Sequence, residues 1–374
     1  MKQHILLGIV LVLIVGSILY LDSITNRGTL TEEEQQEAEI KIEEVEQTVG
    51  ASEDVVEVDA DRIKEKEEKY DRAKELIGIS GYLNTDAITI KENIGKKVIL
   101  VDFWTYSCIN CQRTLPYINA WNEKYKDDGL LIIGVHSPEF DFEKDYSNVE
   151  RAIEKFSVKY PVVQDNDFKT WRAYGNRYWP RKYLIDIDGF IVYDHIGEGR
   201  YQETEDNIRR ALNERKELLD EAELVRTYAD PNVDDPLTFR IETPELYFGY
   251  RWASRESIGN SQGYVEDTLV SYSIPSGIYS DKFYLSGKWQ NNKEYMELMS
   301  SGTVVLDYKA KNVNIVAGSS EPVEIKIYVD DKLTDTITVQ EETLYNIVSG
   351  EDYSRHKLEI KASNGLRMYT FTFG

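Results

Sequence analysis

The hydrophobic pattern divides the chain into an apolar start, an acidic stretch, a region of alternating strands and helices, and a region of short strands. Residues 5–21 carry no charge, and a helix of that length rises about 1.5 Å per residue, roughly enough for a short transmembrane segment. Residues 30–75 are rich in glutamate with few apolar positions, which predicts a solvated, partly helical spacer. Within it, Asp61–Leu76 is the best helix candidate, with Gly78 near its end.

Residues 78–225 alternate two kinds of pattern. Short apolar runs predict buried strands, and apolar positions three and four apart predict helices. The predicted strands are Ala87–Ile90, Lys97–Trp104, Leu130–Val135, Tyr160–Val163, Tyr183–Ile187 and Phe190–Tyr193. The predicted helices are Cys111–Tyr125, Tyr146–Phe156, Lys169–Tyr174 and Thr204–Ala222. This alternation indicates an α/β fold with helices on both faces of the sheet.

Beyond Asp230–Pro231 the chain consists of short strands separated by turn residues. The candidate strands are Val304–Tyr308, Val313–Val316, Glu324–Val329, Thr336–Val339, Lys357–Ile360 and Tyr369–Phe373. Within Glu324–Val329, Ile325 and Ile327 alternate with Lys326 and Tyr328, which is the period of a half-buried strand. The regular spacing predicts an all-β sandwich over residues 231–374.

Length and composition agree with this division. A chain of 374 residues exceeds one ordinary core, and 41% hydrophobic residues exclude wholesale disorder. We therefore expect an anchor at 1–25, an acidic linker at 26–77, an α/β domain at 78–225 and a β-sandwich at 231–374. A formal charge of −23 argues against nucleic acid as a partner, because phosphate contacts need clustered Lys and Arg.

The apolar start predicts an uncleaved membrane anchor. A cleaved signal peptide is the alternative, but no A-x-A-like site follows the run. Lys2 precedes the run and acidic sequence follows it, so the positive-inside tendency places the rest of the chain on the extracytoplasmic side.

Two cysteines, Cys108 and Cys111, lie three positions apart where a predicted buried strand meets a helix. Two cysteines cannot form a disulfide framework in so long a chain, and their number excludes four-cysteine zinc. A mixed cysteine–histidine site is not excluded by count, but no metal is predicted because the histidines show no ligand spacing. They are His4, His136, His195 and His356. A C-x-x-C in this setting indicates thiol–disulfide chemistry, the alternative being two reduced core cysteines.

The position of each thiol predicts its role. Cys108 would lie at a helix N-terminus, where partial positive charge favours the thiolate that attacks disulfides. Cys111 lies one turn later and would resolve the mixed disulfide. Asp102 lies in the apolar strand before them, where burial would raise its pKa and let it exchange a proton with Cys111. An edge-facing Asp102 paired with Lys97 is the alternative.

Two prolines flank this pair. Pro116 falls inside the predicted helix and is expected to kink it. Trp179–Pro180 precedes a strand, where a cis peptide bond would lie against the cysteines and an ordinary trans turn is the alternative.

The residues around the cysteines resemble a known superfamily. The string from Asp102 to Pro116, D-F-W-T-Y-S-C-I-N-C-Q-R-T-L-P, and the string Y-W-P-R-K-Y-L-I-D from Tyr178 to Asp186 are similar to thioredoxins. They most resemble TlpA/ResA-like redoxins and the redox part of DipZ-type proteins, over about Gly78–Leu219. The resemblance implies a thioredoxin-like fold, with a larger insert than in thioredoxin over Glu139–Tyr160.

The resemblance also assigns site residues. It implies that Cys108 is the nucleophile, that Cys111 is the resolving thiol and that Pro180 is a cis-proline. Trp179 would present its backbone to an extended client segment. Trp104 lies in the matching motif beside the site, with Pro116 in the helix that follows.

The C-terminal region resembles the carbohydrate-binding-module-like domain of the DipZ family, a jelly-roll type of β-sandwich. The matching strings are Thr243–Tyr250, Leu285–Trp289 and Tyr369–Gly374. A carbohydrate partner is implied, with Trp252 and Trp289 able to stack on sugar rings, although aromatic residues at such positions are more often core. The multi-helix CcdA-like domain of that family is not found in this sequence, so a separate membrane electron donor of CcdA type is expected.

The resemblance implies a membrane-anchored extracytoplasmic reductase that restores thiols in exported proteins, for example in cytochrome c maturation. No cofactor is expected beyond a redox-active Cys108–Cys111 disulfide. One alternative is a disulfide-forming oxidase. Another is a thiol peroxidase, which Gly134–Pro138 favours although the usual peroxidase cysteine motif is missing. A third is a binding protein acting through its β-sandwich.

Overall fold

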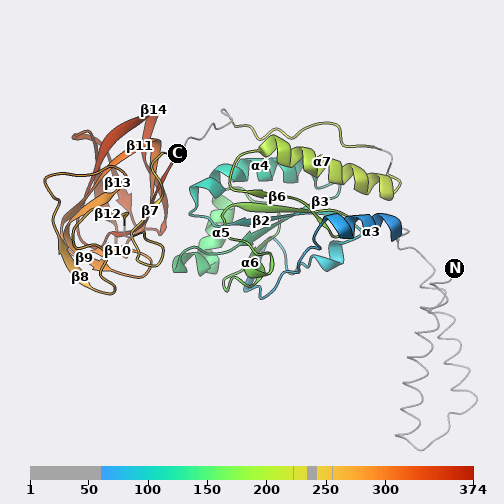
Figure 1. The fold of residues 1–374 in the computed structure, drawn as a ribbon, viewed down its shortest axis with the longest axis horizontal. Coiled ribbons are helices and arrows are strands. Elements are labelled where there is room, and N and C mark those ends of the chain that lie inside the picture. The colour runs from blue at the N-terminus through green and yellow to red at the C-terminus, as the bar shows by residue number, and fades with distance from the viewer. Residues whose placement is uncertain (1–59, 222, 234–241, 255) are drawn as a thin grey trace, which may run out of the picture. The chain divides into compact units, whose positions relative to one another are not determined.

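The computed structural model describes residues 60–221, 223–233, 242–254 and 256–374. The predicted anchor at 1–25 and residues 26–59 of the predicted linker lie outside the described residues. Within the described ranges, no helix is both long and apolar enough to cross a membrane. The described residues belong to one compact unit, in which an α/β domain is followed by an all-β domain (Figure 1).

The α/β domain is built on a six-stranded sheet of order β1-β4-β3-β2-β5-β6. The strands are β1 (Gly81–Leu83), β2 (Val98–Trp104), β3 (Leu130–His136), β4 (Val162–Gln164), β5 (Arg181–Ile185) and β6 (Ile191–Ile196). The three strands β2, β3 and β4 are parallel, and the others are antiparallel to their neighbours. Every residue of β2 is buried, so the strand that leads to the cysteines lies at the centre of the core.

Helices cover both faces of this sheet, which confirms the α/β prediction (Figure 1). They are α3 (Ala60–Lys69), α4 (Ile109–Tyr125), α5 (Tyr146–Lys155), α6 (Lys169–Ala173) and α7 (Tyr201–Leu218), with 3₁₀ turns η1 (Lys91–Asn93) and η2 (Asp141–Lys144). Apolar side chains of α4, α5 and α7 join one core cluster. Trp171 of α6 joins a second cluster, which lies against the other face.

The predicted strand Ala87–Ile90 is wrong. Thr89 and Glu92 cap η1 reciprocally, each side chain accepting a hydrogen bond from the other residue's backbone N–H. The Glu75 carboxylate accepts from the N–H of Ile90. Side chains therefore satisfy these backbone groups, and no strand partner is needed. The edge strand is β1 instead, paired with β4.

The first described helix is shorter than predicted, because α3 ends at Lys69 and not at Leu76. It is held by Lys66, whose Nζ lies 2.6 Å from Asp186 and 2.8 Å from Asp188, in the turn between β5 and β6, and 2.5 Å from Glu214 of α7. The three carboxylates lie near enough together to hold a metal ion, but the ammonium group of Lys66 contacts all three of them.

The C-terminal domain is all-β, as predicted. Its strands are β7 (Leu246–Tyr247), β8 (Leu269–Tyr272), β9 (Phe283–Asn291), β10 (Met296–Leu298), β11 (Gly302–Gly318), β12 (Val323–Val329), β13 (Lys332–Val339), β14 (Thr343–Ala362) and β15 (Arg367–Phe373). They form one hydrogen-bonded network of order β13-β12-β14-β11-β15-β10-β9-β8, with β7 paired to β15. Two separate sheets, as in a simple sandwich, are not seen among these strands.

The long strand β11 explains this connected sheet. The sequence predicted two short strands in its place, but β11 pairs with β14 over its length and has irregular register near Ala310 and Val313. Before that point β11 also pairs with β9, and after it with β15. Bulges bend a strand, so β11 changes partners and the sheet folds over its own apolar core.

Candidate active site

The two cysteines lie where β2 meets α4. Cys108 is the N-cap residue of α4, and its Sγ accepts a hydrogen bond from the backbone N–H of Cys111 at 3.3 Å. Cys108 is partly exposed, Cys111 is 1% exposed, and both are free thiols. Burial raises the pKa of Cys111 well above that of an ordinary thiol. The outer sulfur is thus accessible for attack, and the inner one needs a base before it can react.

Asp102 is buried in the centre of β2, near enough to Cys111 for its charge to act on that thiol. Its carboxylate is 1% exposed, and burial raises its pKa to about 6. The negative charge of Asp102 in turn contributes to the raised pKa of Cys111. The alternative in which Asp102 faces an edge and pairs with Lys97 is wrong, because β2 is buried along its whole length.

The partner of Asp102 is Lys182, which the sequence analysis missed. The two residues are paired directly across β2 and β5, with Nζ 3.9 Å from Oδ1. Lys182 is fully buried, so its pKa is lowered by desolvation, while its charge lowers the pKa of Asp102. The sequence did contain a signal for this partner, because a lysine inside the apolar strand that follows Pro180 needs a buried negative charge beside it.

The Trp179–Pro180 peptide bond is cis. Because Arg181 pairs with Phe103, the proline adjoins the end of β2 that leads to the cysteines. The Trp179 indole donates a hydrogen bond to the Ser137 carbonyl at 2.9 Å, which fixes the residue assigned to client contact. Both Trp179 and Cys108 pack against the same core cluster.

Glu143 holds the loop before the nucleophile, a role that no pattern in the sequence indicated. Its carboxylate is fully buried and accepts from the Ser107 hydroxyl at 2.6 Å and the Ser107 N–H at 3.3 Å. It also accepts from the N–H groups of Glu139 and Phe140. Burial raises the pKa of Glu143. These bonds tie the residue next to Cys108 to the insert that contains η2.

His136 packs beneath the same loop. Its ring is stacked with Tyr106 at a centroid distance of 5.8 Å, and Nε2 lies 3.4 Å from the Thr105 hydroxyl. Burial lowers its pKa to about 3, so the imidazole is neutral at physiological pH. The segment Gly134–Pro138, which favoured a peroxidase, thus contributes a neutral packing group beside the site.

The remaining predicted residues have packing positions. Trp104 is fully buried with its ring edge against His136. Pro116 lies inside α4, which continues to Tyr125. In the β domain, Trp289 is fully buried in the core and cannot stack on a sugar. Trp252 is 40% exposed, with the Arg251 guanidinium 4.5 Å from its ring centre.

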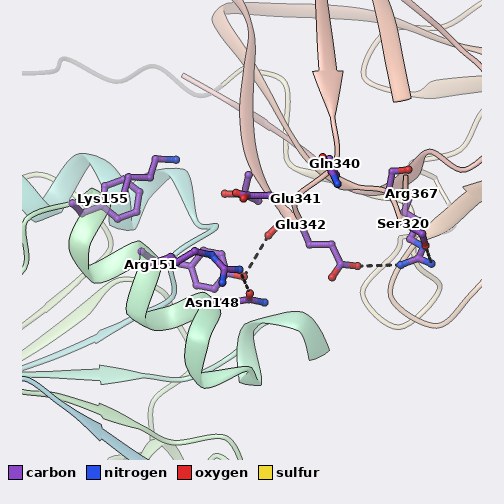
Figure 2. Close-up of a pocket in the computed structure, with 13 residues that line it drawn as sticks. Asn148, Arg151, Lys155, Ser320, Gln340, Glu341, Glu342 and Arg367 are labelled. Atoms are coloured by element: carbon purple, nitrogen blue, oxygen red, sulfur yellow. Dashed lines mark hydrogen bonds and ion pairs between the residues drawn. The ribbon is translucent and has the colours of Figure 1, made fainter. Parts of the chain in front are cut away.

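The pocket drawn in Figure 2 does not contain the cysteines. It has a volume of about 340 Å³ and lies between α5 and loops of the β domain. Its labelled lining residues are Asn148, Arg151, Lys155, Ser320, Gln340, Glu341, Glu342 and Arg367. Tyr106 also lines it, so the pocket adjoins the back of the loop that carries the nucleophile.

Two family models match the chain. Residues 78–212 match the model described as Redoxin, and residues 243–374 match the one described as thioredoxin-like C-terminal domain. DipZ of Mycobacterium tuberculosis is 37% identical over 310 residues, which cover 81% of this chain and 43% of that protein. The chain therefore spans less than half the length of the DipZ proteins that it matches.

Shorter proteins match the redox domain alone. The thiol-disulfide oxidoreductase ResA of Bacillus thuringiensis is 30% identical over 149 residues, which cover 39% of this chain and 81% of that protein. A solved thiol:disulfide interchange protein of Chlorobium tepidum, of the thioredoxin family, covers 38% of this chain and 97% of its own, with 17% identity and a TM-score of 0.34.

Proposed function

This chain belongs to the thioredoxin superfamily as a TlpA/ResA-like thiol–disulfide oxidoreductase related to DipZ, and we propose that it reduces disulfides of exported proteins. The observation that supports this best is the geometry of the Cys108–Cys111 pair. A partly exposed thiol caps a helix, and a buried thiol lies one turn away, near a buried carboxylate of raised pKa. That asymmetry suits an exchange with two successive attacks.

The reaction passes two electrons from the enzyme to its client. The Cys108 thiolate attacks one sulfur of the client disulfide, so that the client S–S bond breaks, a mixed disulfide forms and one client thiolate leaves. Asp102 then takes the proton of Cys111. The Cys111 thiolate attacks Cys108 Sγ, the second client thiolate leaves, and the Cys108–Cys111 disulfide remains.

Asp102 and Lys182 supply the proton acceptor for the second attack. A carboxylate with a pKa of about 6 is ionised at neutral pH, yet is basic enough to take a proton from a nearby thiol. Lys182 keeps that carboxylate from becoming a still weaker acid. In this proposal the exchange uses the two thiols and these side chains, with no other cofactor.

The setting of the reaction is part of the same proposal. Residues 5–21 are uncharged and long enough to anchor the chain, and Lys2 before them favours an extracytoplasmic redox domain, because positive charges tend to stay on the cytoplasmic side. A separate membrane protein of CcdA type would return electrons to the disulfide.

A carbohydrate would bind the β domain near Trp252, whose ring is exposed. The strongly negative charge makes nucleic acid an unsuitable partner.

Trapping the mixed disulfide tests the exchange. With Cys111→Ser the second attack is blocked, so client proteins should accumulate as Cys108-linked species on non-reducing gels of the cell envelope. The control is the double variant Cys108→Ser/Cys111→Ser, which should trap none. An absence of linked species in the single variant would contradict the mechanism, and mass spectrometry of trapped species identifies the clients.

The reduction potential decides the direction of exchange. A value near that of thioredoxin, about −270 mV, supports a reductase, and one near that of DsbA, about −120 mV, supports the alternative of an oxidase. The potential is measured by equilibrating the protein with glutathione or dithiothreitol buffers and quantifying the free thiols.

Fractionation tests the location. The protein should sediment with membranes, and an added protease should digest its redox domain in intact spheroplasts. Recovery in the soluble cytoplasmic fraction, or protection from the protease, would contradict the proposed setting and leave the chemistry intact.

A further inference from the structure

The β domain contacts the residue that follows the nucleophile. Ile109 packs against a small apolar cluster that joins the two domains. On the α/β side the cluster contains Phe140, and on the β side it contains Tyr369 and Leu344. The Tyr369 ring lies 5.0 Å from that of Phe140 and 4.9 Å from that of Phe142, edge to face in both cases. The cluster that contains Tyr369 of β15 thus packs against Ile109, the first residue of α4.

Hydrogen bonds hold the same contact from its polar side. The Glu294 carboxylate accepts from the Asp141 N–H at 2.7 Å, and the Tyr247 hydroxyl donates to Glu139 at 2.5 Å. Glu294 and Tyr247 belong to the β domain, while their partners belong to the insert that Glu143 ties to the nucleophile loop. The contact is therefore held at several points around the site.

A further residue of the β domain reaches α4 itself. Gly374 lies so close to the Arg113 guanidinium that a Cβ atom placed there would collide with it. Cys108 and the two residues after it are all only partly exposed. Close to the cis-proline in sequence, Tyr178 is 49% exposed. The β domain thus packs beside the start of α4, whereas the residue before Trp179 and the cis-proline is exposed.

We propose that the β domain is a fixed wall of the client-binding groove and that Tyr369, which is 3% exposed and packs against Phe140, determines specificity by holding that wall in place. The groove admits an extended or unfolded segment that carries the disulfide along Tyr178–Pro180, and it excludes disulfides on the convex surface of a folded protein, which would collide with the β domain. Discrimination by a clash with the wrong partner is a general source of specificity. The proposal rests on the proposed exchange at Cys108.

The proposal is tested by measuring the rates at which the protein reduces three different disulfides. The reduced full-length protein is mixed with bis(2-hydroxyethyl) disulfide, with an unstructured peptide bridged by one disulfide, and with folded insulin. The variants are Tyr369→Ala and, from a second strand of the same cluster, Leu344→Ser. The matched control is Tyr279→Ala, because Tyr279 is a β-domain tyrosine that is 75% exposed. Circular dichroism establishes that each variant is folded.

The wall predicts a selective change. Both cluster variants should reduce insulin roughly tenfold faster than the unaltered protein, with the small disulfide and the peptide within about twofold, and Tyr279→Ala should change none of the three. If all folded variants reduce insulin at the same rate as the unaltered protein, the proposal that the β domain restricts access is wrong. Failure of the unaltered protein to reduce even the small disulfide would instead contradict the proposed function, so the two failures are distinguishable.

If the variants do not fold, a measurement on the unaltered protein still tests the proposal. Cys108 should react with N-ethylmaleimide much faster than with a bulky polyethylene-glycol maleimide, whereas the same two reagents should label an unstructured cysteine peptide at similar rates. If the ratio of the two rates is the same for the protein and the peptide, no wall stands beside the nucleophile.

Discussion

The ammonium group of Lys182 lies 3.9 Å from the carboxylate of Asp102, with both side chains buried at paired positions of β5 and β2. Two opposed effects act on the carboxylate. Burial raises its pKa, the lysine charge lowers it, and burial prevails, leaving a pKa of about 6. The carboxylate of this pair therefore changes its charge just below neutral pH, close to a thiol that must lose a proton.

Replacing Asp102 with Asn should slow the resolving step. In the unaltered protein, resolution should speed up as pH rises through about 6, because the carboxylate becomes a base there. General-base assistance contributes roughly 10²-fold or more, so Asp102→Asn should lose about that factor and the inflection with it. Stopped-flow decay of a preformed mixed disulfide measures the step. An unchanged inflection in the variant would assign it to another group.

Replacing Lys182 with Met should move the same inflection upward. The lysine charge lowers the pKa of Asp102, so its removal lets burial raise that pKa further and shifts the profile above about 6. The exposed Lys124 supplies the control, since Lys124→Met should leave the profile in place. A downward shift in Lys182→Met would contradict the sign of this interaction.

Replacing Glu143 with Ala should destabilise the nucleophile loop. The buried N–H groups and the Ser107 hydroxyl that it accepts from would lose their partner, at a cost of about 1–3 kcal/mol. Urea unfolding measures the loss, and alkylation of Cys108 reports on the loop. Glu154→Ala, at an exposed site of the next helix, should change the unfolding free energy by less than about 0.5 kcal/mol. A similar effect of both substitutions would exclude a special role for Glu143.

Protonation of Glu139 should make the stability of the molecule depend on pH. The single Tyr247 hydroxyl proton faces two carboxylates, 2.5 Å from Glu139 and 3.0 Å from Glu245, so a second proton is needed for both contacts to be hydrogen bonds. Burial raises the pKa of Glu139, and the other charges around it add to the shift. They are those of Glu143, Glu245 and Glu294.

The sign of that dependence follows from the raised pKa. The folded state binds more protons than the unfolded state above a pH of about 4.5, the ordinary value for glutamic acid, so the free energy of unfolding should fall as pH rises through the folded-state pKa. Glu139→Gln cannot ionise and should flatten this part of the profile. Urea unfolding at a series of pH values measures it. An equally steep decline in the variant would place the effect elsewhere.

Much of the redox domain could be predicted because its signals are local. The apolar run of β2, the C-x-x-C at the start of α4 and the proline before β5 each specify their own segment. The partners Lys182 and Glu143 could not be predicted in the same way. Their roles depend on strand register and on how the insert folds back onto the nucleophile loop, and neither is written in a single stretch of residues.

The errors have similar causes. Ala87–Ile90 has the composition of a strand, but the distant Glu75 caps its backbone and a 3₁₀ turn follows. The strand β11 was predicted in two pieces, and only Lys357–Ile360 of β14 was predicted, because polar residues near their bulges resemble turns in sequence. The contact of Ile109 with the β domain links residues too far apart for any periodicity to relate.

The attachment of α3 lies far from the two cysteines. Lys66 binds the turn after β5, and β5 runs antiparallel to β2, so this turn lies at the end of the sheet away from Cys108. A strand of seven residues separates the two ends, about 20 Å at 3.3 Å per residue. The helix at which the described chain begins and the reactive thiols are therefore attached to opposite ends of the same sheet.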